Sequence, residues 1–218
     1  MCGQFALFSN IQAIIDYYNF LKQFENEFSP EALHEFLKTK KDKTPYNQYE
    51  FPNNKITPSM YVPVCYNENN HFKIDWMRWG LVPSWSKDES FAMKLINARS
   101  ETISEKPSFK NAWKSRRCLI PCNHFYEWDK QKQKFEIKIQ NQTIFSLAGL
   151  WERWQKEDFI LNTFTVITCE SRGEMGNIHE RMPVIIKDTF YENWLNGKIT
   201  DFNDTNLFSL SDFLIEAV

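Results

Sequence analysis

Short apolar segments separated by polar turns constrain the fold of this chain more than any other feature of its sequence. Seven of them follow residue 59, at 60–66, 71–79, 117–122, 125–128, 135–139, 143–150 and 163–168. Apolar runs of this length, bounded by turn residues, are typical of β-strands. Few helical segments accompany them. We therefore expect an α+β fold, with a curved, mostly antiparallel, barrel-like sheet at its core and helices at its periphery.

Helical periodicity is limited to a few short stretches. Residues 10–24 have the spacing of an amphipathic helix. Its predicted buried side consists of Ile11, Ile14, Ile15 and Tyr18. The sequence Ser29-Pro30-Glu31 has the capping residue, the first-turn proline and the acidic side chain that begin a helix.

Two further short helices are expected in the second half of the chain. One covers 106–114, with Ser108 near its start. The other covers 188–196, where Asp188 would cap the first turn and Gly197 would end the helix.

The remaining polar stretches do not divide the chain. Residues 38–58 contain three prolines among polar residues and are predicted to form a long surface loop. Nothing resembles an interdomain linker, so we expect one domain over residues 1–218.

Composition excludes several classes of protein. The start of the chain has no basic region, and no apolar run approaches 18 residues, so neither a signal peptide nor a membrane span is expected. We therefore predict a cytoplasmic protein, associated with the nucleoid in a bacterium. The formal net charge of −2 argues against a protein that coats duplex DNA without specificity.

Five cysteines, an odd number at irregular spacing, argue against a disulfide framework. Cys118, Cys122 and His124 lie close together in sequence, but no second ligand pair follows at the spacing of a zinc finger. We therefore expect no metal and no other cofactor.

Cys2 is the first candidate for chemistry. An initiator methionine before a small residue such as cysteine is normally removed, which would leave an amine and a thiol on adjacent carbons. The reference pKa values of these groups, about 7.7–8.0 and about 8.5, leave a usable fraction of each nucleophilic near pH 7. The amine can condense with an aldehyde, and the thiol can then close a thiazolidine ring. Taken alone, Cys2 could also be an incidental second residue.

Two polar clusters contain candidate acid–base groups. Glu127 lies in the aromatic segment Phe125-Tyr126-Glu127-Trp128, where strand alternation would place it on the side of Phe125. Burial there would raise the pKa of the carboxyl and suit it to proton transfer, although a salt-bridged strand carboxylate has the same pattern. His179 precedes Arg181 by two residues, and a histidine in such a position is either structural or catalytic.

Basic and aromatic residues indicate a nucleic-acid surface. Lysines and arginines are frequent between 94 and 117, which is either a solvated face or a strip that contacts phosphates. Trp79 and Trp85 flank a Gly/Pro loop and could fill the core or stack on unpaired bases.

Taken together and in order, these motifs resemble the SOS response-associated peptidase (SRAP) family of abasic-site-processing proteins. The resemblance runs from residue 1 to about residue 186. It rests on Met1-Cys2-Gly3, Ile56-Thr57-Pro58, the segments 77–85, 97–102, 117–121, 125–128 and 148–152, and Ile178-His179-Glu180-Arg181-Met182-Pro183.

The resemblance implies a covalent crosslink between Cys2 and the ring-opened aldehyde of an abasic site in single-stranded DNA. Asn97 would hold the Cys2 end, Glu127 would shuttle the proton of the Cys2 amine, and His179 would assist sugar ring opening. Arg99 and Arg181 resemble phosphate ligands. The positions that resemble those shaping the DNA path and the abasic pocket are Pro58, Trp79, Tyr126, Trp128 and Thr168.

Two residues depart from the family pattern. Gln4 stands where the family usually has arginine, which puts one phosphate contact in doubt. His124 stands where a small residue is usual, and it would either reach the site or fill the turn.

Two other functions stay open at this point. Cys2, Glu127 and His179 could form a peptidase that removes Met1 autocatalytically or cleaves other proteins. The basic and aromatic residues could also form a non-catalytic reader of single-stranded nucleic acid. The expected partner is single-stranded DNA with an abasic site, and the expected state is a monomer.

Overall fold

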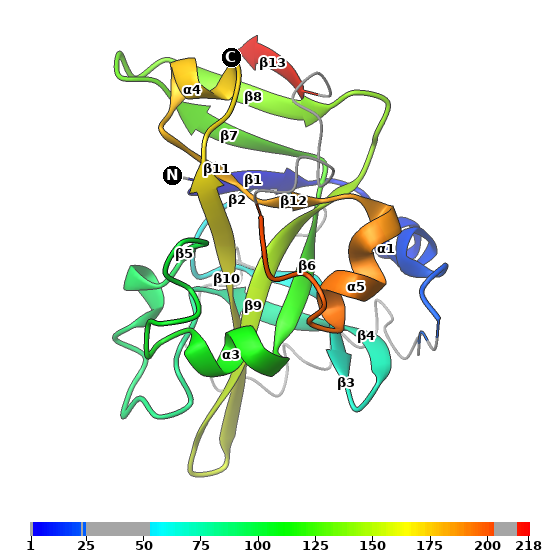
Figure 1. Ribbon diagram of the computed structural model, residues 1–218, viewed down its shortest axis with the longest axis vertical. Coiled ribbons are helices and arrows are strands. Elements are labelled where there is room, and N and C mark those ends of the chain that lie inside the picture. Colours follow the sequence, from blue (N-terminus) through cyan, green and yellow to red (C-terminus); the bar gives the residue numbers. More distant parts are fainter. Residues whose placement is uncertain (1, 23, 25–52, 203–212) are drawn as a thin grey trace.

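The computed structural model describes residues 2–22, 24, 53–202 and 213–218. Its strands form two sheets (Figure 1). The smaller has the order β13-β8-β7-β1-β2, and every neighbouring pair in it is antiparallel. Its strands are β1 (Gln4–Leu7), β2 (Asn53–Ile56), β7 (His124–Trp128), β8 (Lys134–Ile139) and β13 (Phe213–Ala217).

The larger sheet contains a closed ring of five strands. They are β3 (Tyr61–Glu68), β4 (His71–Trp79), β6 (Arg117–Cys122), β9 (Phe145–Lys156) and β10 (Phe159–Glu170). The ring closes because β10 pairs with both β9 and β4, and only the β10–β4 pair within it is parallel. The mostly antiparallel, barrel-like core expected from the sequence is confirmed.

Three short strands extend this barrel. They are β5 (Asn97–Arg99), β11 (Arg181–Pro183) and β12 (Ile185–Ile186). Both β5 and β11 pair with the last residues of β10, and β12 pairs with β9. Residues about 80 positions apart in sequence thus meet at one end of β10.

The helices are short and lie at the periphery (Figure 1). They are α1 (Ile11–Tyr18), α3 (Lys110–Ser115), α4 (Met175–Ile178) and α5 (Tyr191–Leu195), with 3₁₀ turns at Ala92–Lys94 and Asp188–Phe190. The α+β class expected from the sequence is therefore confirmed. Among the described residues, none of the helices is both long and apolar enough to cross a lipid bilayer.

The predicted amphipathic helix is present but ends at Tyr18. Its N-cap is Asn10, whose side-chain oxygen accepts the N–H of Ala13 at 2.9 Å. All four residues of the predicted apolar side are buried, at Ile11, Ile14, Ile15 and Tyr18. The helix start predicted at Ser29-Pro30-Glu31 lies outside the described residues.

Other boundaries differ from the predictions. Within the predicted loop 38–58, the described part contains strand β2, which forms because its backbone pairs with β1. The helix predicted at 106 begins at Lys110, and Ser108 does not cap it. Asp188 lies in the first turn of its helix instead of capping it, whereas Gly197 ends that helix as predicted, with φ +75°.

An aromatic stack joins the two sheets. Phe5 on β1 lies 5.2 Å from Trp79 on β4, and Trp79 stacks on Phe164 of β10 at 6.2 Å between ring centroids. All three side chains are fully buried. Burying aromatic side chains of this size supplies a large share of a core's stabilisation. This contact fixes the amino-terminal strand, and with it Cys2, against the barrel.

Candidate active site

Cys2 is fully buried and lies two residues before the start of β1. The register of β1 on β7 pairs Gln4 with Tyr126 and Phe5 with Phe125. Continued toward the amino end, this register brings Cys2 to the end of β7 that carries Glu127 and Trp128. Burial, and then the negative charge of Glu127, raises the pKa of the Cys2 thiol well above its usual value, so the thiol is protonated at neutral pH.

Asn97 fixes the main chain of Cys2. It is the first residue of β5, and pairing with Val166 of β10 sets its position. Its side-chain Nδ2 donates a hydrogen bond to the carbonyl oxygen of Cys2 at 2.9 Å. The sequence placed Asn97 near the Cys2 end, and the structure contains this contact.

Glu127 lies on the buried side of β7. Alternation along β7 places Phe125 and Glu127 on one side and Tyr126 and Trp128 on the other, as the sequence predicts. The residue is only 1% exposed. Burial raises the pKa of its carboxyl to about 7, an effect that the positive charge of the chain's amino terminus opposes. The carboxyl is thus close to half ionised near neutral pH.

His179 follows α4 at the edge of the same region. Its ring Nδ1 accepts the backbone N–H of Arg181 at 2.9 Å, so the neutral ring carries its proton on Nε2. Burial, and then the positive charge of the amino terminus, lowers the pKa of the ring. The same positive charge therefore acts to lower the pKa values of both Glu127 and His179.

Arg181 already has partners in the structure. Its two terminal nitrogens bind the carboxylate of Glu101 at 2.8 and 3.0 Å, and one of them also donates to the carbonyl oxygen of Thr168 at 2.7 Å. A bidentate pair of this kind orients a guanidinium strongly. A phosphate would therefore compete with Glu101 for Arg181. Nothing in the sequence marked Glu101 as this partner.

Arg99 and Pro58 keep accessible positions. Arg99 is exposed on β5, opposite Thr168, and makes no ion pair with any described residue. Pro58 is half-buried between β2 and β3. Trp79 and Thr168 are both fully buried, and their role in shaping the DNA path and the abasic pocket stays a prediction.

Trp79 is a core residue for an identifiable reason. Its indole N–H donates to the carbonyl oxygen of Ile96 at 2.9 Å, and its ring stacks on Phe164. Trp128, in contrast, is 36% exposed, and Trp85 is 54% exposed. Base stacking therefore remains open to these two tryptophans and not to Trp79.

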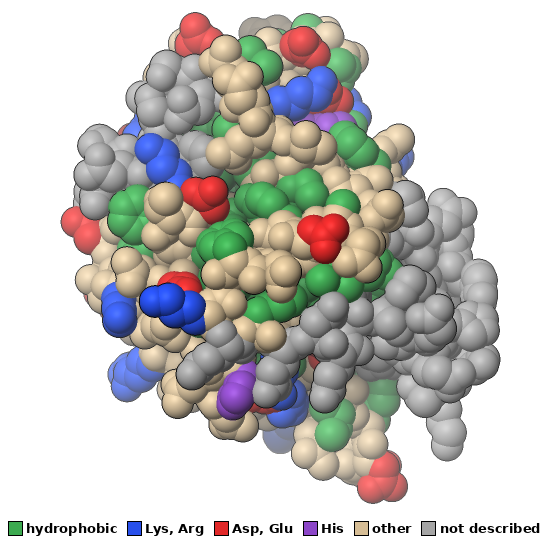
Figure 2. Space-filling view, turned by 90° about the vertical axis from the view of Figure 1, so that its right-hand side faces the viewer, with side chains coloured by type: hydrophobic (Ala, Val, Ile, Leu, Met, Phe, Trp, Pro, Cys, Tyr) green, Lys and Arg blue, Asp and Glu red, His purple; other side chains and the backbone are tan. Residues whose placement is uncertain are grey.

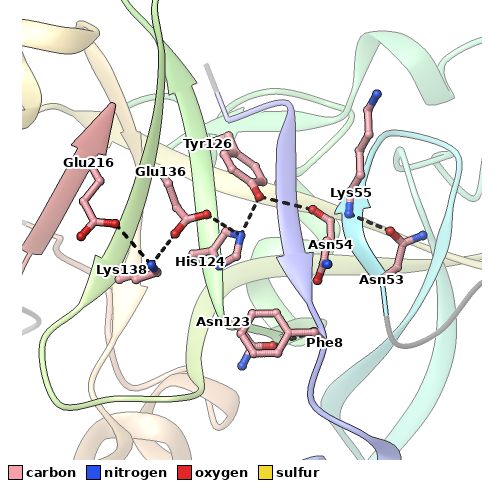
Figure 3. A network of polar contacts seen from close by, with 10 residues as sticks. All are labelled: Phe8, Asn53, Asn54, Lys55, Asn123, His124, Tyr126, Glu136, Lys138 and Glu216. Atoms are coloured by element: carbon pink, nitrogen blue, oxygen red, sulfur yellow. Dashed lines mark hydrogen bonds and ion pairs between the residues drawn. The ribbon is translucent and has the colours of Figure 1, made fainter. Parts of the chain in front are cut away.

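The outer side of β7 carries a polar network (Figure 3). His124 Nε2 lies 2.7 Å from the hydroxyl of Tyr126 and 3.2 Å from a carboxylate oxygen of Glu136. Lys138 joins Glu136 to Glu216 on β13. His124 thus faces away from Glu127 and orients Tyr126, so it is poorly placed to act on Cys2. No local sequence pattern predicts this network, because its members come from three strands.

The predicted basic strip is not a continuous surface. Arg116 pairs with Glu152 at 2.8 Å, and Arg117 is buried against two tryptophans. Figure 2 shows another face, the right-hand side of Figure 1 and not the side of β5, and it has hydrophobic side chains at its centre with lysines and arginines scattered around it. Only the lysines of the strip and Arg99 stay exposed.

The fold and these contacts define a class of protein. It has a closed β-barrel, a second sheet that begins at the amino terminus, and a buried Cys2 held by an amide beside a buried carboxylate. The chain belongs to the SOS response associated peptidase (SRAP) family, whose sequence profile matches residues 1–213.

Named relatives agree with this assignment. The abasic site processing protein YoqW of Bacillus subtilis (strain 168) is 39% identical over 206 residues, covering 92% of this chain and 83% of YoqW. The abasic site processing protein HMCES of Xenopus tropicalis is 33% identical over 147 residues, covering 55% of this chain and 44% of HMCES. A crystal structure of a protein from Bacteroides thetaiotaomicron, 22% identical, matches the fold with a TM-score of 0.78 over 100% of this chain and 92% of its own.

Proposed function

We propose that this protein captures abasic sites in single-stranded DNA as a covalent thiazolidine on Cys2. The observation that carries the proposal is the fixed position of Cys2, with its carbonyl held by Asn97 and its thiol under the charge of Glu127. The names of the relatives, abasic site processing proteins, support the substrate.

The chemistry balances with the groups of this chain. Removal of Met1 frees the amine of Cys2. The sugar opens when its C1–O4 bond breaks, O4 takes a proton and the C1 hydroxyl loses its proton, which leaves the aldehyde. The amine then attacks the aldehyde carbon and water leaves, which gives a Schiff base. The thiol sulfur adds to the imine carbon, and its proton ends on the nitrogen. No oxidant or cofactor is required.

The electrostatics support an order of events. Because the Cys2 thiol is protonated at neutral pH, the amine reacts first and the thiol closes the ring afterwards. Glu127, with a pKa of about 7, accepts a proton from the amine. His179 offers its Nε2–H to the sugar oxygen during ring opening.

The test is a denaturing gel after incubation with an abasic or an intact oligonucleotide. We expect a heat-stable adduct only with the abasic strand, and none from Cys2→Ala, which should still bind the strand. Intact-mass measurement should show loss of one methionine in active protein. Retention of Met1 in an active sample would exclude the thiazolidine.

The other functions are outcomes of the same experiment. Equal retention of both strands in a native gel, without an adduct in the denaturing gel, would identify a non-catalytic reader. Cleavage of added peptides would identify a peptidase acting on other proteins. The preference for single strands, the monomeric state and the cytoplasmic location stay predictions.

A further inference from the structure

Arg117 is a buried positive charge without an acidic partner among the described residues. It is 4% exposed, and its guanidinium carbon lies 3.9 Å from the ring centroid of Trp113 and 4.6 Å from that of Trp194. Burial lowers its pKa to about 10. Buried charges usually have a partner of opposite sign, because desolvation is costly.

The hydrogen bonds of Arg117 use only some of the N–H donors of its guanidinium. Nε donates to the carbonyl oxygen of Trp113 at 3.2 Å, and Nη1 donates to that of Ile199. A guanidinium has five N–H donors, so these two bonds do not use them all. The two tryptophan rings stabilise the cation but accept no further conventional hydrogen bond.

Arg117 lines a cavity of about 250 Å³ between the end of α3, the β3–β4 turn and the end of α5. Its other polar lining is rich in amide and ammonium donors, from Asn67, Asn69, Asn70, Asn196 and Lys114. Among the described residues that line it, there is no aspartate or glutamate. Although Asn67 already donates to Asn196 at 2.6 Å, a lining of two cations and several amides without an acid has the composition that suits an anion.

A row of lysines leads to this cavity. Lys106, Lys110 and Lys114 are four residues apart, and the N–H of Lys110 donates to the carbonyl oxygen of Lys106 at 2.8 Å. Four helical residues advance about 6 Å, so the three side chains lie along one side of the turn and of α3. All three are exposed, and none makes an ion pair with another described residue. A row of this kind suits a polyanion better than a small isolated anion.

We propose that this cavity binds a backbone phosphate of the DNA strand captured at Cys2, and that the lysine row contacts the neighbouring phosphates. This inference rests on the proposed function. The element α3 follows β5, which carries the exposed Arg99, through residues 100–109 and lies below it in Figure 1. The site would position the strand without contributing to the reaction.

The first experiment tests the cavity with inorganic phosphate. Arg117→Ala removes a side chain that packs on both tryptophan rings and could prevent folding, so the variant is Asn196→Asp. The new carboxylate can still accept the hydrogen bond that Asn67 donates at 2.6 Å, and it would repel an anion. We expect phosphate to raise the melting temperature of the wild type more than that of Asn196→Asp.

Asn141→Asp, which makes the same charge change in an exposed turn elsewhere, is the control. It should respond to phosphate like the wild type, including the general stabilisation that phosphate gives by exclusion from protein surfaces. Equal responses of all three proteins would overturn the cavity as a phosphate site.

The second experiment tests the source of the phosphate. Affinity for a long and a short abasic strand is measured between 50 and 200 mM salt, in a Cys2→Ala background. Affinity for a single strand falls with salt concentration to the power of about 0.7 for each phosphate contact. Raising the salt fourfold therefore weakens binding by about 2.6-fold per contact, and a variant that lacks one contact should lose about 2.6-fold less affinity over this range. We expect Lys114→Ala and Asn196→Asp to have this weaker salt dependence with the long strand. With the short strand, their salt dependence should be unchanged.

Lys156→Ala, at the end of β9, is the matched control and should leave the salt dependence unchanged. Phosphate binding combined with unchanged salt dependence of the variants would assign the cavity to free phosphate and overturn the DNA contact. Separately, with Cys2 restored, the short abasic strand should form an adduct with each variant. Failure of the wild type to form it would refute the proposed function instead.

Discussion

The position of Glu127 on β7 determines the pKa of its carboxyl. It lies on the side of β7 that faces the core, where burial raises its pKa to about 7. The exposed Trp128 follows directly on the other side. Sequence alternation predicted this arrangement, because a carboxylate that shares a side with Phe125 has to be desolvated.

Glu127→Gln keeps the shape of the side chain and removes its titration. Adduct formation by the wild type should accelerate as pH rises through about 7, because the carboxyl becomes the base that the amine needs. The variant should be slower at pH 7 and lose this part of the profile. Single-turnover rates between pH 5 and 8 measure the difference. Identical profiles would show that Glu127 is not the base.

Glu127→Gln should slow the reaction, but it should stabilise the folded protein relative to the wild type as pH rises. A carboxyl whose pKa is raised by folding binds its proton more tightly in the folded state, so it loses stabilisation as pH rises from its usual value of 4.5 to about 7. Glu127→Gln should therefore become more stable relative to wild type across this window, by about 3 kcal/mol at most. Urea unfolding at pH 5 and pH 8 measures the change, and a constant difference would contradict the raised pKa.

At the scale of elements, the end of β10 gathers the residues that the sequence separates. It pairs with β5, which carries Asn97 and Arg99, and with β11, which begins at Arg181. The parallel β10–β5 pair joins segments about 70 residues apart, and no local pattern predicts such a pair. For that reason the sequence identified these residues individually and not the contact between Arg181 and Glu101.

Glu101→Gln tests what Arg181 does in this group. If Arg181 binds a phosphate, removing the competing carboxylate should tighten DNA binding about two- to fivefold, the value of a partly exposed ion pair. Glu105→Gln removes the same charge from the same turn, where no described residue pairs with it, and corrects for the general change in charge. Fluorescence anisotropy with an abasic strand measures both variants. Weaker binding by Glu101→Gln alone would make Arg181 a positioning residue.

The sequence predicted much of the fold because its evidence is local. Short apolar runs bounded by turn residues located the barrel strands, and the amphipathic pattern located the buried side of α1. It could not distinguish Trp79 in the core from Trp85 at the surface, since both flank the same loop and only the packing of Phe5 and Phe164 decides. Helix starts were also misplaced, because tertiary packing overrode the capping pattern at Ser108 and Asp188.

The whole molecule depends on closure of the barrel, which holds the end of β10 and therefore the site in place. Gly149 lies where three strands of the ring meet, paired with Cys118 on β6 and Val166 on β10. A Cβ at this position would lie 2.8 Å from the carbonyl oxygen of Thr165 and 2.4 Å from Cδ1 of Ile120. The isoleucine can move, but the carbonyl belongs to the backbone of β10.

Gly149→Ala should therefore force β9 away from β10 and destabilise the protein by about 1–3 kcal/mol, the usual cost of overpacking a core. Gly176→Ala is the matched control, because a Cβ there would meet nothing within 4 Å and the residue lies in α4. Alanine in a helix should be neutral or stabilise by up to about 1 kcal/mol. Urea unfolding of both variants measures the difference.

Because Asn97 is held by its pairing with β10, Gly149→Ala should also slow adduct formation below the unfolding midpoint, whereas Gly176→Ala should not. Wild-type stability in Gly149→Ala would mean that the β9–β10 contact is looser than the structure shows.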